Sequence, residues 1–202
     1  MRPPWDVLLI GGASGVGKST IVYEVARHLD AALTAVDDIS TVLETMTSPD
    51  EHPELHRWRL HPEEVVALDD EAMLAHTRAY AAEVTQALVP VIAEHLGAAP
   101  PLVLEGEFLV PALAATERFV DVPAGGRVRG VFLLEDEEQL GRNFAAREGE
   151  EQPRRARAAA RYGVWLRSEC ERLGVPSLAA RPWDTLVRRV IASASARATN
   201  ER

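Results

Sequence analysis

The sequence predicts an α/β protein in which a parallel β-sheet carries helices on both faces. First, an apolar run at residues 7–10 is typical of a buried strand, and a glycine-rich loop connects it to a helical apolar pattern at 21–29. Second, strand and helix patterns alternate along the chain, with further strands expected at 31–36, 102–104, 128–134 and 175–178. Third, acids follow two of these strands, where ligands bind in open α/β sheets.

The glycine-rich loop is the most specific motif in the chain. It reads Gly-Ala-Ser-Gly-Val-Gly-Lys-Ser and fits the phosphate-binding pattern G-x-x-x-x-G-K-[ST]. Glycines let successive amides turn toward phosphate oxygens, the Lys18 ammonium reaches the β- and γ-phosphates, and the Ser19 hydroxyl is a Mg²⁺ ligand. A ligand-free turn is the alternative, which the flanking strand and helix disfavour. The predicted nucleotide contacts are Gly12, Ala13, Ser14, Gly15, Val16, Gly17, Lys18, Ser19 and Thr20.

Two aspartates follow the second predicted strand. Asp37 is a candidate for the base that accepts the proton of a substrate hydroxyl, or for a group that orients Mg²⁺. The alternative is an N-cap for a helix at 39–46, a position that aspartate favours. We assign the functional role to Asp37 and a cap or supporting role to Asp38, and expect both to border the substrate. Which of the two is the base stays open.

The third predicted strand is followed by Glu105, Gly106 and Glu107. An acid just after a buried strand is placed near Mg²⁺ or the attacking hydroxyl, so Glu105 is a candidate ligand of the metal and of the substrate. Gly106 would let a ligand approach the backbone closely, which makes it a candidate substrate contact. An ordinary strand-to-loop turn is the alternative.

Residues 47–97 are expected to cover the pocket of the phosphate acceptor. Residues 47–61 are polar and predict a loop or short turns, and a long helical zone from 62 to 96 follows, with Pro90 as a candidate kink. His52, His56 and His61 invite a metal hypothesis. Their spacings do not make a structural zinc site and no cysteine joins them, so solvated histidines or one substrate contact are favoured.

Arginines gather between residues 142 and 161, in a segment that we expect to act as a lid. A helix at 136–147 carries Arg142 and Arg147, a polar stretch at 148–152 is a candidate hinge, and further arginines begin the next helix. Phosphoryl transfer needs mobile cations that neutralise the transferring group and exclude water. Arg142 and Arg147 are therefore candidate catalytic residues beside Lys18, with a solvated basic face as the alternative.

The loop after the last predicted strand contains two candidate contacts for the nucleotide base. Arg181 and Trp183 could hold an adenine ring between a guanidinium and an apolar surface. Asp184 is expected to cap the final helix.

Composition predicts one soluble globular domain. The chain has 202 residues, of which 47% are hydrophobic and 26% charged. The net charge of -9 argues against nucleic acid as the main partner. A single cysteine, Cys170, fits a reducing cytoplasm and is interpreted as incidental, and neither a signal peptide nor a membrane-length apolar run is apparent. We expect a cytoplasmic monomer or homodimer.

Several segments together resemble one family. They are residues 9–20, the Val-Asp-Asp-Ile segment at 36–39, and residues 102–111, 142–147 and 173–176. Residues 102–111 are similar to the family's Ile-x-Glu-Gly-x-x-Leu-x-Pro segment. Residues 142–147 are similar to its Arg-Phe-x-x-Arg lid segment, with one residue inserted. The chain thus resembles the P-loop kinases related to archaeal 2-phosphoglycerate kinase, within the nucleotide and shikimate kinases. The resemblance implies one three-layer P-loop NTPase domain over 1–202 with strand order 2-3-1-4-5, and transfer of phosphate from ATP with Mg²⁺ to a hydroxyl group.

The resemblance leaves the small-molecule acceptor open. Where the family tends to carry arginines after its Asp-x-Ile segment, residues 40–44 read Ser-Thr-Val-Leu-Glu, which would not suit a phosphorylated acid. Glu44, Glu105 and Glu107 favour a neutral or cationic hydroxyl compound by charge matching, such as a sugar, an amino alcohol or an antibiotic. A nucleotide or nucleoside kinase and a non-catalytic ATP-binding module are the alternatives.

Overall fold

The main sheet is parallel and five-stranded, with the order β2-β3-β1-β6-β7. The computed structural model describes residues 3–98 and 100–196. The strands of this sheet are Val7–Gly12 (β1), Ala32–Ala35 (β2), Leu102–Gly106 (β3), Val128–Leu134 (β6) and Ser177–Ala179 (β7). Counted along the chain this is the order 2-3-1-4-5, so the predicted sheet is confirmed. A short antiparallel pair, Arg118–Phe119 (β4) with Val122–Pro123 (β5), is not predicted by the sequence.

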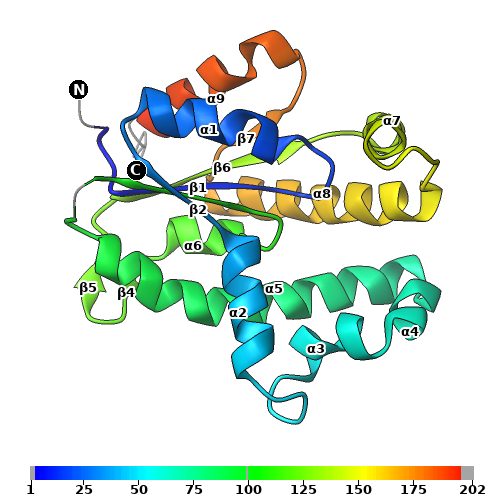
Figure 1. The fold of residues 1–202 in the computed structure, drawn as a ribbon. Helices are drawn as coiled ribbons and strands as arrows, with labels where there is room; N and C mark the ends of the chain where they lie inside the picture. Colours follow the sequence, from blue (N-terminus) through cyan, green and yellow to red (C-terminus); the bar gives the residue numbers. More distant parts are fainter. Residues whose placement is uncertain (1–2, 99, 197–202) are drawn as a thin grey trace.

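Helices cover both faces of this sheet and make three layers (Figure 1). On one face lie α1 (Lys18–His28) and α9 (Leu186–Ser195), which contact each other. On the other face α8 (Pro153–Leu173) packs against α5 (Asp70–His95) and α6 (Pro111–Ala115). Strand β1 is completely buried because it is covered on both sides, which explains its unbroken apolar run. None of the described helices has the length and apolar character needed to cross a membrane.

Three helices extend the molecule beyond the sheet: α2 (Val36–Met46), α3 (Pro53–Leu60) and α4 (Pro62–Ala67) (Figure 1). The prediction of a loop or short turns over 47–61 is wrong for residues 53–60, which form α3. Pro53 fits the first helical turn, and Leu55 and His56 are buried, so tertiary contacts with α2 and α5 stabilise a helix too short to show a periodic pattern. The helical zone from 62 is divided before α5, where Asp69 accepts hydrogen bonds from two backbone amides. Pro90 lies inside α5 and does not end it.

The ends of the later helices follow mostly local signals. Asp136 caps α7 (Glu137–Glu148), and the left-handed Gly149 ends it with φ of 80°. Gly174, with φ of 65°, ends α8 as predicted. The predicted cap at Asp184 is wrong, because this residue lies within the short 3₁₀ helix η1 (Trp183–Thr185), and Thr185 takes the cap position of α9.

Candidate functional site

The glycine-rich loop joins β1 to α1 and is tightly packed from outside. Gly15 and Gly17 have φ of 81° and 93°, in the left-handed region that favours glycine. A Cβ atom at Gly15 would meet the Phe144 ring of α7, and one at Gly17 would overlap the Trp183 ring of η1. Two aromatic rings therefore support the loop, and glycine is required at both positions.

Lys18 is the buried charge at the centre of this loop. Its ammonium donates hydrogen bonds to the carbonyl oxygens of Gly12 at 2.8 Å and Ala13 at 3.1 Å. Burial lowers the pKa of Lys18, while the carboxylates of Glu107, Glu105 and Asp37 act to raise it. The site thus holds one desolvated cation within the electrostatic range of three acids.

Ser19 and Glu105 meet at the start of α1. The Ser19 hydroxyl donates to Oε1 of Glu105 at 3.0 Å, because parallel pairing of β1 with β3 brings the carboxyl ends of these strands together. The other carboxylate oxygen, Oε2, is buried and has no hydrogen-bond partner among the described residues. A hydroxyl beside an unsatisfied carboxylate oxygen fits a hydrated Mg²⁺ ion, which takes oxygen ligands and keeps several waters.

The acids after β2 are placed differently from the expected cap. Strand β2 runs directly into α2, so Asp37 and Asp38 lie exposed in the first helical turn and Ala35 occupies the cap position without a side-chain hydrogen bond. The cap assigned to Asp38 is therefore wrong. Asp37 still acts on the site, since its charge contributes to raising the pKa of Lys18 and of Glu107.

Gly106 is the buried last residue of β3 and does not follow the strand's end. A Cβ there would lie 2.6 Å from Cβ of Val36, so its missing side chain makes room for α2. The reason given for a substrate contact at Gly106, a close ligand approach, is not supported by this geometry.

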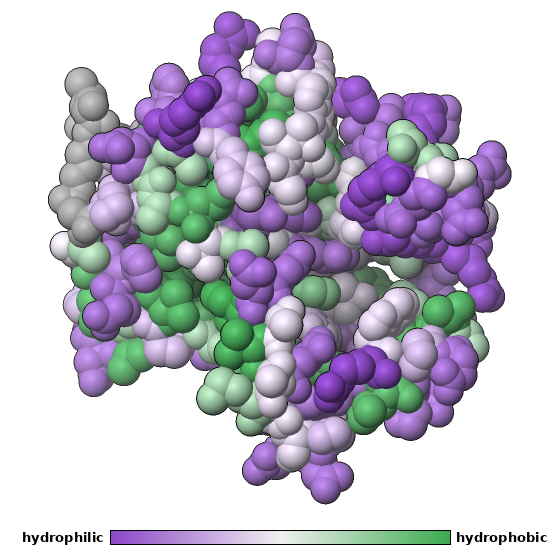
Figure 2. Space-filling view, in the orientation of Figure 1, coloured by the Kyte–Doolittle hydropathy of each residue, from purple (hydrophilic) through white to green (hydrophobic). Residues whose placement is uncertain are grey.

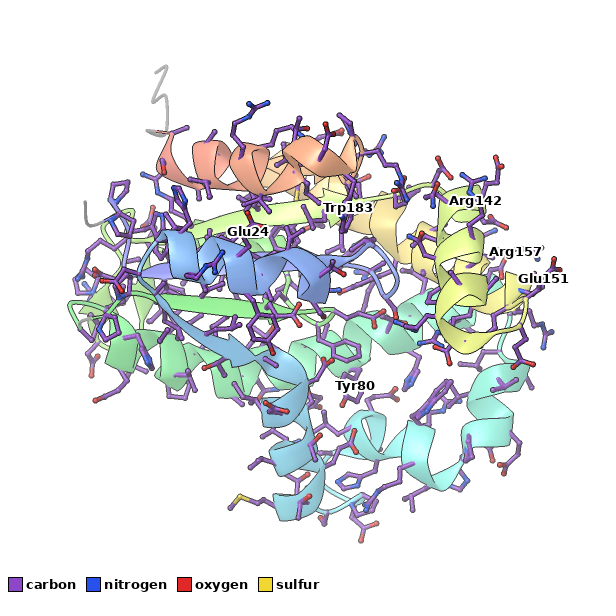
Figure 3. All side chains as sticks on the ribbon, turned by 45° about the horizontal axis from the view of Figure 1, so that its top comes forward. Glu24, Tyr80, Arg142, Glu151, Arg157 and Trp183 are labelled. Atoms are coloured by element: carbon purple, nitrogen blue, oxygen red, sulfur yellow. The ribbon has the colours of Figure 1, made fainter. Side chains whose placement is uncertain are left out.

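The arginines of the predicted lid divide into two groups. The guanidinium carbons of Arg147 and Arg155 lie 5.3 Å and 4.5 Å from the ring centroid of Phe144, and Arg155 Nη2 lies 3.5 Å from the Ser14 hydroxyl. Both arginines pair with the Glu148 carboxylate. Arg142 instead pairs with Glu138 and Gln139 on the exposed side of α7 (Figure 3). Arg147 and Arg155 adjoin the loop in this conformation, whereas Arg142 does not.

Asn143 is a contact that sequence reasoning missed. Its side-chain amide donates to the carbonyl oxygen of Gly15 at 2.8 Å, beside the fully buried Phe144. These contacts fasten the middle of α7 to the phosphate-binding loop. Its place between Arg142 and Arg147 in the sequence indicates that Asn143 lies near the site. Nothing in the sequence indicates this hydrogen bond to Gly15.

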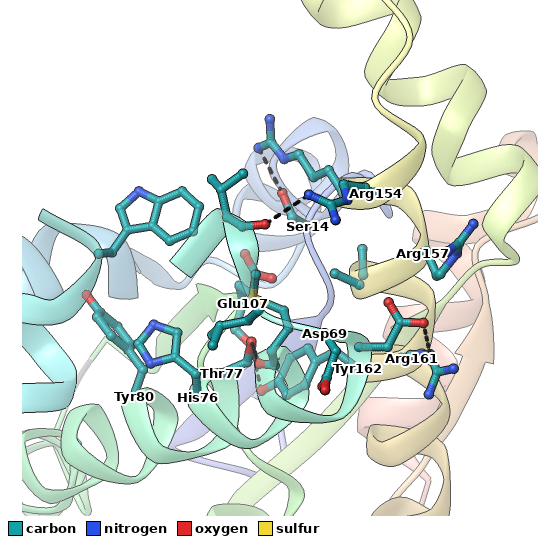
Figure 4. A pocket seen from close by; sticks show the side chains of 18 of the residues that line it. Ser14, Asp69, His76, Thr77, Tyr80, Glu107, Arg154, Arg157, Arg161 and Tyr162 are labelled. Carbon is teal, nitrogen blue, oxygen red and sulfur yellow. Dashed lines mark hydrogen bonds and ion pairs between the residues drawn. The ribbon is translucent and has the colours of Figure 1, made fainter. Parts of the chain in front are cut away.

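A cavity of about 1230 Å³ opens beside the loop. It lies between α8 on one side and α2, α3 and α5 on the other, and Figure 2 shows the surface hollowed where the two sides approach. Ser14 and Glu107 border it on the side of the loop, and four arginines of α8 line one wall (Figure 4). The loop thus lies directly beside a space large enough for a small molecule.

Glu107 is the acid that links the loop to the cavity. Burial raises the pKa of its carboxyl, although Lys18 and the Ser14 amide oppose the shift. Its backbone oxygen accepts a hydrogen bond from the Tyr162 hydroxyl at 3.2 Å. From the sequence, Glu107 is named only as one of three acids whose charge would suit a neutral or cationic acceptor.

The candidate base contacts lie on the other side of the loop. Trp183 packs against Gly17 beside α1 and does not line the cavity, while Arg181 lies 3.5 Å from Glu135 (Figure 3). A nucleotide base next to Trp183 and an acceptor in the cavity would therefore occupy opposite sides of the phosphate-binding loop.

The histidines between 47 and 61 do not share one environment. His56 is buried, and its ring bonds with Thr47 and Arg59 at 3.0 Å each, so the expectation of a solvated side chain is wrong there. His52 lies 3.0 Å from Glu83, and His61 lies 3.6 Å from Glu64. None of the three lines the cavity.

The fold and the loop define a P-loop protein with a three-layer α/β architecture. The chain is similar to 2-phosphoglycerate kinase of Methanocaldococcus jannaschii, with 34% identity over 115 residues that cover 53% of this chain and 35% of that protein. The chain therefore spans about a third of the length of this curated relative. No family model matches it.

Two solved structures extend the comparison. A shikimate kinase from Aquifex aeolicus has a TM-score of 0.50 at 18% identity and covers 96% of this chain and 95% of its own. A gluconokinase from Sinorhizobium meliloti has a TM-score of 0.49 at 20% identity, over 96% and 93% of the two chains. The likeness to the shikimate kinase shows a shared fold. The expected resemblance to 2-phosphoglycerate kinase and to P-loop small-molecule kinases is confirmed.

Proposed function

We propose that this protein transfers the γ-phosphate of ATP, with Mg²⁺, to a hydroxyl group of a small molecule. The observation that carries the proposal is the continuity of the phosphate-binding loop with the cavity, since Ser14 belongs to both. A nucleotide phosphate held by the loop would face a compound bound next to it. The names of the similar proteins, which are kinases of small hydroxyl compounds, agree with this reaction.

The roles of the residues follow from their positions. The loop amides and Lys18 would hold the phosphates, and Ser19 and Glu105 would hold Mg²⁺. The ion would neutralise phosphate charge during transfer. Arg147 and Arg155 would leave Glu148 and neutralise the transferring group, whereas Arg142 would need a different lid conformation to do so.

Two carboxylates are candidates for the base that takes the proton of the acceptor hydroxyl. Asp37 is exposed at the start of α2, and Glu107 borders the cavity with a raised pKa. A base works best when its pKa approaches the working pH, which favours Glu107 as an alternative to Asp37. Replacing each by its amide should identify the base by the larger loss of kcat.

ADP production from Mg·ATP tests the proposed reaction. The panel contains 2-phosphoglycerate, shikimate, gluconate, nucleosides and aminoglycosides, with Lys18→Ala as the inactive control. We expect one compound class to stimulate ADP release strongly, and the stimulation to disappear in the control. Slow release that no compound changes would contradict the kinase assignment and favour a nucleotide-gated binding protein.

A further inference from the structure

The two walls of the cavity differ in chemistry. Arg154, Arg157 and Arg161 lie on the α8 side, while His76 and Tyr80 lie on the α5 side, with Ser14 and Glu107 between the two walls (Figure 4). The transferring phosphate would be held near Ser14, where the arginines supply positive charge. The rest of the acceptor would then face the wall formed by Glu44, Trp58, His76 and Tyr80, which we name the α5 wall.

The Glu44–Tyr80 pair of the α5 wall can accept hydrogen bonds but has no proton left to offer. The Tyr80 hydroxyl donates its proton to Oε1 of Glu44 at 2.7 Å, which leaves only lone pairs on the tyrosine oxygen and on the second oxygen of Glu44. Nδ1 of His76 lies 2.7 Å from Oε2 of Glu54. A carboxylate only accepts, so Nδ1 carries the proton of this contact and Nε2 is the nitrogen not used by Glu54.

His76 is built into the wall and is not a surface residue. It is only 7% exposed, yet it lines the cavity, and its Nε2 has no hydrogen-bond partner among the residues that the structure describes. Because Nδ1 bonds with Glu54, Nε2 is the ring nitrogen that is left without a protein partner in the described part of the chain. A ligand in the cavity can therefore bond with this nitrogen.

The charge of the wall agrees with the direction of its hydrogen bonds. Within residues 3–98 and 100–196, neither Glu44 nor Glu54 has a lysine or arginine partner, and their contacts are the Tyr80 hydroxyl and the His76 ring. Aromatic faces complete the wall. The half-exposed Trp58 ring lines the cavity, and the ring centroids of Tyr80 and Phe108 lie 4.3 Å apart. Carboxylates beside aromatic faces are the chemistry that recognises an ammonium group.

Resting on the proposed function, we infer that the phosphate acceptor is a hydroxyl compound that carries a protonated amine, and that the amine binds the α5 wall through Glu44, Tyr80 and His76. Glu54 acts as a positioning residue that fixes the His76 ring. An amino sugar or amino alcohol has both groups, and an acidic acceptor such as a sugar acid would place its carboxylate against Glu44.

Calorimetry without nucleotide tests the inference separately from the reaction. The probes are glucosamine, glucose and gluconate, which share a hydroxylated framework and differ in charge, together with kanamycin as a larger polyamine. We expect the two amines to bind more tightly than glucose, and gluconate to bind least. Equal or tighter binding of glucose or gluconate would overturn the inference, as would the absence of binding by both amines.

Variants locate the amine on the wall. Glu44→Gln keeps an oxygen for the Tyr80 hydroxyl but removes the charge, and should weaken kanamycin binding about tenfold or more, as does the loss of a charged hydrogen bond. Glu54→Leu removes the acceptor of the His76 Nδ1 proton and should weaken binding in the same direction by releasing the His76 ring. It provides a second variant if the first folds poorly. Glu63→Gln on the exposed side of α4 is the matched control and should bind as the wild type does. Unchanged binding in both wall variants would overturn the assigned site, whatever the Lys18→Ala control shows about ADP release.

Discussion

The hydroxyl oxygen of Ser19 lies 3.0 Å from Oε1 of Glu105, although 86 positions separate the two residues. The contact exists because β1 and β3 are neighbours in the sheet and end at the same edge. It leaves Oε2 of Glu105 buried without a partner in the described part of the chain. This geometry is the basis for proposing Ser19 and Glu105 as the residues that would hold Mg²⁺ where α1 begins.

Glu105→Gln should separate Mg²⁺ binding from ATP binding. The amide keeps the shape and accepts the Ser19 hydrogen bond, but an uncharged oxygen is a poorer ligand for a hard cation. We expect the Mg²⁺ concentration for half-maximal ADP release to rise about tenfold to a hundredfold, the range seen when a group that supports a metal is lost. A Mg²⁺ titration at fixed ATP measures the shift. An unchanged midpoint would remove Glu105 from the metal site.

Arg155 and Arg142 form a matched pair for testing the lid. Arg155→Ala removes the cation beside Ser14 and should lower kcat about a hundredfold or more, since an arginine on the transferring phosphate has at least this effect. Arg142→Ala removes an exposed ion pair with Glu138 and should change kcat little. Steady-state kinetics at saturating ATP compares them. A larger loss in Arg142→Ala would mean that α7 turns during the reaction.

Glu107 should make folding stability depend on pH. Burial raises its pKa in the folded protein, so the folded state binds the proton more tightly than the unfolded chain does. Stability is then lost as the pH rises from the ordinary glutamate pKa through the raised one. Glu107→Gln removes this loss, so its Tm should exceed that of the wild type at pH 7.5 and the gain should shrink at pH 4. Thermal unfolding monitored by circular dichroism measures both, and a gain independent of pH would contradict the assignment.

Cys170 should resist thiol reagents in the folded protein. It is buried in α8, and burial raises the pKa of its thiol to about 12, so almost no thiolate forms at pH 8. Reaction with an aromatic disulfide reagent should be slow under native conditions and fast in denaturant. Rapid native labelling would show that α8 opens locally, and the labelled fraction would report how often.

Local sequence signals predicted the parts of the fold that depend on neighbours within a few residues. The apolar run of β1, the glycines of the loop, the end of α8 at Gly174 and the helix of α7 all follow from such patterns. Helix α3 was missed because it is short and its stability comes from burying Leu55 and His56 against other helices. The β4–β5 pair was missed because its strands are only two residues long.

The sequence by itself determined the phosphate-binding loop, the parallel sheet and the candidate acids and arginines, because these depend on residue type and spacing. Tertiary structure decided which of them meet. Ser14 and Arg155 are 141 positions apart, and their proximity depends on how α8 packs on the face of the sheet. Whether an arginine of α7 faces the loop depends on the rotation of that helix, which Phe144 and Asn143 fix by packing on Gly15. The α5 wall likewise combines residues of α2, α3 and α5, whose side chains share a surface only after the helices pack.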